Sequence, residues 1–282
     1  MTGAEAASIT ARTGAASAQA VSNARTWVRG EHLESYAHRV LTPAEVLIFV
    51  RYREQLSRRV LDLGCGAGRT LGYLVALGAE AHGIDIAPAM VEHCRRAFPS
   101  AAVRVGDLAS LGECVDGSFD AILATDNLLD VLGDAERRRA LEVIHQLLAP
   151  EGLLIFSSHD LGYLDDHPGP REWETSSRTK TLRKLAERAP VDLVRAIGRR
   201  RRAAANRRRL MPLQERHADY AVINDFPHDY SLLHYYIRRD AQVHQLKELG
   251  FVTIDCIDAE GTTVAPGGSG PTDSLYYVAR LG

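Results

Sequence analysis

The sequence predicts an α/β fold built on a seven-stranded, mostly parallel sheet whose last strand is antiparallel. Short apolar runs alternate with stretches of helical period, which is typical of strands that are buried on both faces by helices. A glycine-rich turn follows the first of these runs. A Gly- and Pro-rich loop, residues 261–273, joins the last two runs, and such a short return favours an antiparallel final strand.

Composition sets the broad class. The chain has 282 residues, of which 45% are hydrophobic, enough for a full α/β domain with material left for an insertion. Its four cysteines contain no C-x-x-C pair, which is typical of reduced thiols and predicts a cytoplasmic location. No apolar run approaches the roughly 18 residues of a membrane span. Residues 1–25, rich in Ala, Ser and Thr, predict a disordered tail rather than a signal peptide.

Residues 26–58 predict a helical N-terminal lid in two pieces. Thr42, Pro43 and Glu45 form a helix start, with Thr42 as the cap and Glu45 closing a capping box. One interpretation is a helix pair that only packs on the sheet. The other is a lid from which Tyr36 contacts substrate or cofactor, with Arg51 and Tyr52 as further candidates.

A glycine-rich turn lies at the start of the predicted core, residues 59–161. The apolar run 59–63 predicts a buried strand, and a helical pattern over 69–77 follows it. Three glycines at alternate positions between them permit a sharp turn that brings the backbone close to a ligand. The spacing departs from the dinucleotide fingerprint G-x-G-x-x-G, because Gly68 comes one position early.

Two further strands are predicted to end in carboxylates at the same edge of the sheet. Strand 79–85 ends at Asp85, where a carboxylate accepts both hydroxyl donors of a ribose. Strand 102–105 is followed by Asp107, for which a simple turn-forming role is the alternative. A nearly apolar strand over 119–125 then leads into a polar loop at that edge.

These segments together resemble the class I S-adenosylmethionine (SAM)-dependent methyltransferases, a family with a Rossmann-like fold. Residues 62–68 resemble its motif D-x-G-x-G-x-G, residues 85–90 resemble D-x-S-x-x-M, and residues 148–154 resemble L-x-P-G-G-x-L. The resemblance implies SAM as cofactor, S-adenosylhomocysteine as product, an adenine contact at Asp107 and packing of Met90 on the ring. The cofactor-binding residues implied in this way are Asp62, Gly64, Cys65, Gly66, Gly68, Arg69, Asp85, Ile86, Met90, Gly106, Asp107, Leu108, Thr125, Asp126 and Asn127.

The end of the fifth predicted strand, 153–157, supplies a candidate base. His159 follows it, and imidazole is the side chain best suited to accept a proton near neutral pH. His228 and His234 are second choices, and a histidine that only bonds a neighbouring loop is the alternative. No metal site is predicted, because the histidines lack H-x-x-x-H and H-E-x-x-H spacing.

Residues 162–236 predict an insertion that caps the substrate. Between Arg171 and Arg209 it holds 14 Lys/Arg and 4 Asp/Glu, on segments whose apolar spacing predicts a pair of amphipathic helices. Three interpretations of these cations stay open. They form a solvated face, they bind an acidic small molecule, or they bind RNA or a membrane. The aromatic and polar residues that follow predict a substrate wall, with Tyr36 added from the lid: Tyr220, Asn224, Tyr230 and Tyr235.

Residues 237–282 predict the closing part of the core, with a helix and the sixth and seventh strands. The function predicted first is methyl transfer to an O or N atom of a small molecule. Methylation of RNA or protein through the Arg-rich insertion is the second prediction, and a non-catalytic SAM-binding module is the third. The loop at 125–128 lacks the [N/D/S]-P-P-[Y/F] motif of enzymes that methylate base amino groups. Whether the chain forms a homodimer is left open.

Overall fold

The computed structural model describes residues 23–24, 26–27, 36, 39–167, 190–225 and 227–282, with the backbone alone at 190–196, 227 and 228. Most of the predicted tail, residues 1–25, therefore lies outside the described residues. Asn23 and Ala24 are helical, and Asn23 is buried. The predicted boundary of the tail is wrong at Asn23, because its side chain bonds to the body of the protein.

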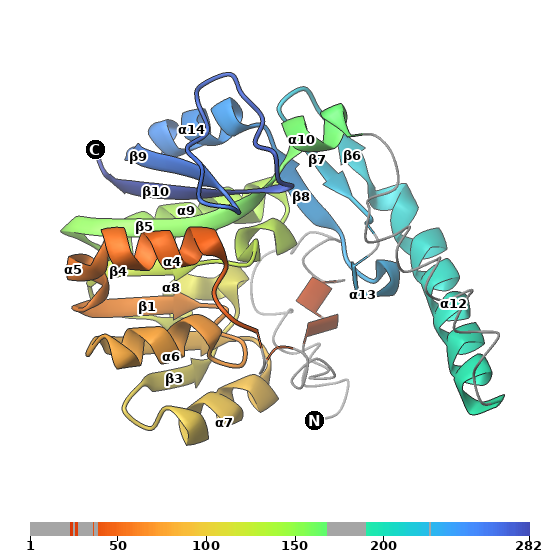
Figure 1. Cartoon of the computed structure of the whole chain (residues 1–282), viewed down its shortest axis with the longest axis horizontal. Helices are drawn as coiled ribbons and strands as arrows, with labels where there is room; N and C mark the ends of the chain where they lie inside the picture. The colour runs from red at the N-terminus through yellow and green to blue at the C-terminus, as the bar shows by residue number, and fades with distance from the viewer. Residues whose placement is uncertain (1–22, 25, 28–35, 37–38, 168–189, 226) are drawn as a thin grey trace.

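Five parallel strands form the centre of the sheet in the order β3-β2-β1-β4-β5 (Figure 1). Four of them match the predicted ranges to within a residue. The fifth is longer than predicted, because it continues past the end of β4 to new partners. The strands are β1 (Arg59–Leu63), β2 (Glu80–Asp85), β3 (Ala102–Val105), β4 (Phe119–Ala124) and β5 (Leu148–Asp160).

The C-terminal strands confirm the predicted antiparallel ending. β10 (Ser274–Leu281) lies between β5 and β9 (Phe251–Asp258) and runs antiparallel to both. β9 is therefore parallel to β5. The loop between β9 and β10 returns the chain directly, as its Gly- and Pro-rich sequence predicts.

The insertion adds strands to the sheet, so the predicted number of seven is wrong and the described sheet has ten. β8 (His234–Ile237) runs parallel to the end of β5, where His159 pairs with Tyr236. Since β10 lies on the other edge of β5, β8 lies on the edge of β5 that β4 uses, beyond the end of β4. β7 (Tyr220–Ile223) and β6 (Glu215–Arg216) follow as antiparallel neighbours.

Helices cover both faces of the sheet with separate apolar clusters. One face carries α4 (Pro43–Arg51), α5 (Arg53–Leu56), α6 (Arg69–Ala76) and α7 (Pro88–Ala97). The other face carries α8 (Leu111–Cys114), α9 (Asp134–Leu147) and α14 (Arg239–Glu248).

The predicted helix start at Thr42 is confirmed. The Thr42 hydroxyl accepts from the Glu45 amide at 3.2 Å, and the Glu45 carboxylate accepts from the Thr42 amide at 2.8 Å. Arg51 and Tyr52, candidates for substrate contact, instead bond Asp255 on β9. The lid helix α4 therefore packs on the sheet.

The insertion also contains a long helix, α12 (Pro190–Leu210), which projects away from the sheet (Figure 1). Its arginines from 199 to 209 are exposed, and so is Ile197, so the predicted amphipathic packing is wrong at this position. The partner helix expected within 168–189 lies outside the described residues. The short helices are α10 (Leu161–Asp166), α13 (Pro227–Tyr230), η1 (Leu108–Ser110), η2 (Leu128–Val131) and η3 (Met211–Leu213). No helix in the described part of the chain is long and apolar enough to cross a membrane.

Candidate active site

The turn after β1 requires its glycines. Gly64, Gly66 and Gly68 have φ of 58°, 52° and 88°, values that side chains with a Cβ rarely adopt. A Cβ at Gly64 would lie 2.4 Å from Leu128 Cδ1, and a Cβ at Gly68 would lie 2.3 Å from Phe98 Cε2. A Cβ at Gly66, by contrast, would have no neighbour closer than 3.8 Å, so the space beside this residue is open to a ligand.

A buried hydrogen bond fixes this turn to the helix that follows. The Thr70 hydroxyl donates to Asp62 at 2.6 Å, and both side chains are buried. Burial raises the pKa of Asp62 to about 7, although the bond from Thr70 opposes it. Asp62 does not line the cavity described below, so its contribution is to hold β1 against α6.

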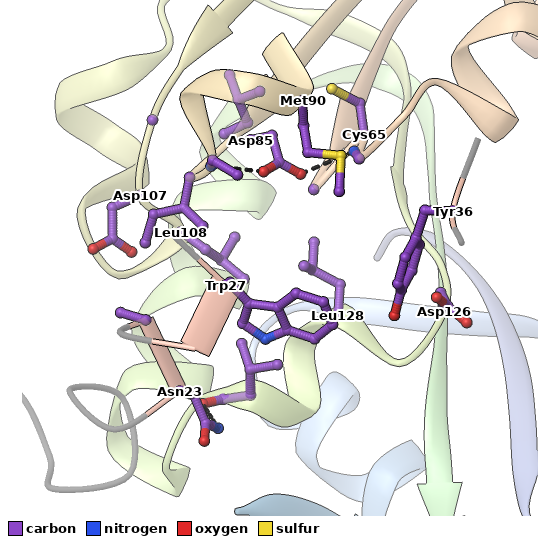
Figure 2. Close-up of a pocket in the computed structure, with 18 of the residues that line it drawn as sticks. Asn23, Trp27, Tyr36, Cys65, Asp85, Met90, Asp107, Leu108, Asp126 and Leu128 are labelled. Atoms are coloured by element: carbon purple, nitrogen blue, oxygen red, sulfur yellow. Dashed lines mark hydrogen bonds between the residues drawn. The ribbon is translucent and has the colours of Figure 1, made fainter. Parts of the chain in front are cut away.

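A cavity opens at the carboxyl ends of β1, β2, β3 and β4 (Figure 2). Met90 and Asp85 lie on one side, Trp27 on the opposite side, and Leu108 and Tyr36 at the two ends. The predicted cofactor residues that line it are Gly64, Cys65, Gly66, Arg69, Asp85, Ile86, Met90, Gly106, Asp107, Leu108, Thr125 and Asp126. The sequence did not predict Asn23 or Trp27 as cavity residues, because both precede every recognisable motif.

Two carboxylates are held in place by backbone amides at the cavity. Asp85 accepts from the Gly66 amide at 2.9 Å and from the Ala87 amide at 2.8 Å, one bond on each oxygen. Asp107 accepts from the Ala109 amide at 2.9 Å, which leaves its second oxygen without a partner among the described residues. Each carboxylate oxygen has two lone pairs, so both groups retain acceptors for a ligand's donors. Burial raises the pKa of Asp85, and the two amide bonds oppose that rise.

The charge of the lining favours a ligand with a positive centre. Asp85, Asp107 and Asp126 face the cavity, together with the single cation Arg69 among the described lining residues. Arg69 is already paired with the buried Glu45 of the α4 capping box. Methionine, leucine and tryptophan side chains supply apolar walls for a flat ring. The chemistry of these residues therefore fits SAM, which combines a sulfonium, an ammonium, a ribose and an adenine.

Tyr36 reaches the cavity, as expected of the lid. Its ring meets Trp27 edge to face at 5.9 Å, and the Arg39 guanidinium lies 4.3 Å above it. Arg39 also pairs with Asp126 at 2.5 Å. Burial raises the pKa of Tyr36 to about 12, so this hydroxyl is a hydrogen-bond donor at neutral pH.

The loop after β4 presents its side chains to two different places. Asp126 and Asn127 both adopt left-handed backbone conformations, with φ of 56° and 57°. Asp126 lines the cavity, whereas Asn127 does not. The Asn127 amide nitrogen lies 3.1 Å from His159 Nε2 and 2.9 Å from the Ser274 hydroxyl, to which it donates. This loop therefore connects the cavity to the end of β5.

His159 is held by a buried acid that the sequence analysis missed. Its Nδ1 lies 2.7 Å from Asp130, which also accepts from the His159 amide and pairs with the fully buried Arg137 at 2.6 Å. Burial alone would lower the pKa of His159, but Asp130 and other nearby carboxylates outweigh it and raise the pKa. No motif marks Asp130, since its role depends on contacts between η2, α9 and β5.

A second histidine–acid pair lies beside the first. His234 Nδ1 lies 2.8 Å from Asp225, and the Tyr236 hydroxyl donates to the other oxygen of Asp225 at 2.7 Å. The His159 and His234 rings are 5.2 Å apart. The structure thus brings two predicted histidines together, while the side chain of His228 lies outside the described part of the chain.

The predicted substrate wall is mostly structural. Tyr235 is buried and donates to Asp134, Tyr220 stacks on it at 4.9 Å, and Asn224 donates to backbone carbonyls. Arg207 lies 5.4 Å above the Tyr230 ring. None of these four residues lines the described cavity, nor do Gly68 and Asn127 from the predicted cofactor set. Tyr220 and Tyr235 therefore pack β7 against β8 rather than lining the cavity.

Among the described residues, no cluster of three His, Cys, Asp or Glu side chains could hold a metal ion. The four cysteines are free thiols.

Comparisons with known proteins agree with this geometry. Residues 60–152 match the family described as a methyltransferase domain. The chain is 26% identical over 144 residues to a ubiquinone biosynthesis O-methyltransferase from Methylococcus capsulatus, covering 45% of this chain and 60% of that protein. It spans about half the length of the first curated relatives it matches, from 48% to 60%.

Solved structures extend the likeness of the fold beyond the matched domain. The CcbJ methyltransferase from Streptomyces caelestis aligns with a TM-score of 0.57 at 15% identity, covering 91% of this chain and 98% of that one. A glycopeptide N-methyltransferase complexed with SAM aligns with a TM-score of 0.51 at 18% identity, covering 86% and 88%. The shared fold therefore includes the sheet beyond residues 60–152.

Proposed function

We propose that this chain, whose residues 60–152 match a methyltransferase domain, is a class I SAM-dependent methyltransferase that transfers a methyl group to an oxygen or nitrogen atom of a small molecule. The observation that carries the proposal is the pair of amide-held carboxylates, Asp85 and Asp107, at the cavity edge. The curated relative named above is an O-methyltransferase, which supports oxygen as one acceptor.

Specific residues would hold the cofactor in this cavity. Asp85 would accept the two ribose hydroxyls, and Asp107 would accept from the adenine amino group, since both retain free lone pairs. Met90 and Leu108 would contact the ring. The open space beside Gly66 would let the amino-acid end approach closely. Arg69 is paired with Glu45, but its guanidinium has further N–H donors that would bind the carboxylate of the ligand. Bound SAM supplies a methyl group on a positively charged sulfur, which is already activated for transfer.

The protein's contribution is then to position an acceptor and to exclude water. Near-attack placement alone is worth several kcal/mol, with effective molarities of roughly 10⁵ M or more. The loop at Asp126 and Asn127 stands between the cavity and the histidine pairs, so an acceptor bound there would lie near both. The absence of a Pro-Pro pair in this loop disfavours a nucleobase amino group as acceptor.

SAM binding tests the cofactor assignment directly. Trp27 lines the cavity, so SAM is expected to change its fluorescence, and calorimetry gives the affinity independently. Asp85→Asn is expected to weaken SAM binding by roughly 10- to 100-fold, because it removes charge-assisted hydrogen bonds. Glu92→Gln, an exposed acid on the next helix, is the matched control and should bind SAM as the wild type does. Equal affinity of the two variants would contradict the assignment.

The acceptor class is tested by transfer of labelled methyl groups from SAM to a small-metabolite pool and to an RNA pool. RNA is the second candidate, because the arginines of α12 are exposed and Arg199 has only a 3.8 Å contact with Asp229. A variant with Arg199, Arg200, Arg201 and Arg202 changed to Gln separates the two. Label in a metabolite that is unchanged by the variant supports the proposal. Label in RNA that is lost in the variant would replace it with the second candidate.

A further inference from the structure

The two histidine–acid pairs at the ends of β5 and β8 are not equivalent. We propose that His234, fixed by Asp225, is the proton acceptor of this enzyme and that its methyl acceptor is a hydroxyl compound, such as an alcohol or a phenol. The inference rests on the proposed function and deepens it. It also reverses the order expected from the sequence, in which His159 was the first choice.

Asp225 fixes the form of the His234 ring. The Asp225 carboxylate can only accept, so Nδ1 of His234 carries the proton and Nε2 presents a lone pair. Tyr236 donates to the second oxygen of Asp225, which fixes the carboxylate from the other side. The alternation along β8 explains this arrangement, because His234 and Tyr236 are two residues apart and point to the same face.

In the neutral form of each ring, the Nε2 lone pair of His159 is engaged in a hydrogen bond, whereas that of His234 is not. The Asn127 amide nitrogen lies 3.1 Å from His159 Nε2 and donates to it, since Nδ1 of His159 is already bound to Asp130. Nδ1 makes the hydrogen bond of the His234 ring, Nε2 has no partner among the described residues, and the side chain keeps 9% of its surface exposed. His234 is therefore the imidazole that can take a proton without first breaking a bond.

A charged carboxylate lies against the His234 ring. Asp225 follows β7, Tyr236 belongs to β8, His159 belongs to β5, and Asp130 of η2 lies behind His159. Asp225 is buried, and burial alone would raise its pKa, but His234 and its other partners lower the pKa to about 2. A buried carboxylate that stays charged stabilises an adjacent imidazolium, which is what a base needs after it accepts a proton.

The pair also lies next to the cofactor cavity. Asn23 lines the cavity, and its side chain donates to the Leu233 carbonyl at 2.7 Å and to the Val131 carbonyl at 2.9 Å. Leu233 directly precedes His234, and Val131 directly follows Asp130. One buried amide therefore joins the cavity wall to the backbone of both pairs.

The chemical step balances without a further reagent. The hydroxyl O–H bond of the acceptor breaks, and its proton goes to His234 Nε2. An oxygen lone pair forms the new O–CH₃ bond, and the electron pair of the broken S–CH₃ bond remains on sulfur. The His234 imidazolium, paired with Asp225, then releases the proton to water.

Diethyl pyrocarbonate tests the lone pair without a known acceptor. This reagent acylates unprotonated imidazole nitrogens, and peptide mass spectrometry of the full-length protein resolves each of the 11 histidines. His234 is expected to react roughly tenfold faster than His159, whose Nε2 bond must first break. The exposed His244 serves as the internal reference. Equal rates at His159 and His234, faster reaction of His159, or no reaction at His234 would overturn the proposal.

A substitution of the acid tests the role of Asp225. In Asp225→Asn methyl transfer is expected to slow, because a neutral amide does not stabilise the imidazolium formed when His234 accepts the proton. An unchanged rate would remove Asp225 from the proposed site.

Methyl transfer provides the second test, with labelled SAM and the acceptor found in the metabolite screen. His234→Gln is expected to lower kcat by roughly 10²- to 10⁴-fold while SAM affinity stays unchanged. His159→Gln should cause a smaller loss, and His244→Gln should cause none. Failure of the wild type to bind SAM would refute the proposed function. Normal SAM binding with full activity in His234→Gln would refute this inference alone.

Discussion

The two halves of the active edge are built in different ways. The cavity half, at the ends of β1, β2 and β3, takes its acids and glycines from residues at or just after the end of each strand. The histidine half, at the ends of β5 and β8, depends on partners far apart in the chain, such as Asp130 with His159 and Asp225 with His234. The acids and glycines of the cavity half are therefore set by neighbouring residues in the sequence, whereas the histidine half depends on tertiary contacts.

The largest expected effect breaks the histidine half. In Arg137→Met, Asp130 loses its buried cation, and the Gln242 and Ser158 side chains lose a donor. We expect a loss of roughly 3–5 kcal/mol in the free energy of unfolding, measured by urea denaturation. Arg138→Met, at the next position of α9 but on the surface, should change stability by less than about 1 kcal/mol. Losses of similar size in both variants would show that the buried network stabilises the fold no more than a surface ion pair does.

The next effect breaks the cavity half. Gly68→Ala and Gly78→Ala both place a Cβ on a left-handed residue, with φ of 88° and 84°. Only the first meets Phe98, because Gly78 has no neighbour within 4 Å. Gly78→Ala should lower the free energy of unfolding by roughly 1–2 kcal/mol. Gly68→Ala should lower it by roughly 1–3 kcal/mol more. Thermal unfolding measures both, and equal costs would mean that Phe98 moves aside freely.

The smallest effect sharpens the comparison through pH. Asp225 has a folded-state pKa of about 2, below its ordinary value of 3.8, so it stabilises the fold above pH 4. That stabilisation, roughly 2 kcal/mol, should be lost as the pH falls from about 4 to 2. Asp62 has a pKa raised to about 7, so its contribution has the opposite sign and is lost as the pH rises from about 4 to 7.

Denaturant titrations across this pH range check both signs. Asp62→Asn should flatten the dependence between pH 4 and 7, and Asp225→Asn should flatten it below pH 4. If Asp62→Asn changed the free energy of unfolding only below pH 4, the assignment of the raised pKa to Asp62 would be wrong.

How much of the fold the sequence could predict follows the same division. The strands from β1 to β4, the capping box at Thr42 and the antiparallel β10 could be predicted, because each is specified by neighbouring residues. Strands β6, β7 and β8 could not, because runs of two to four residues become strands only in the extension of the sheet that begins where β8 pairs with the end of β5.

The candidate site shows the same limit. Asp85 and Asp107 carry a signal in their position after a strand and a turn. Asp225 lies in the aromatic and polar segment that predicts a substrate wall, but whether this residue belongs to a wall or fixes a base depends on which side chain it bonds. The pairing of β7 with β8 makes that choice, because it sets Ile223 opposite His234 and leaves Asp225, two residues further on, within hydrogen-bond distance of the His234 ring.

The outermost strand of the insertion has a consequence for solubility. Adding strands beside β5 moves the edge of the sheet outward, and a free edge offers unpaired amides and carbonyls to other chains. Here that edge is β6, which consists only of Glu215 and Arg216, both exposed and charged. Two residues of opposite charge give a short and poorly matched template for another strand. The insertion therefore ends in a strand that resists edge-to-edge aggregation of the sheet it enlarges.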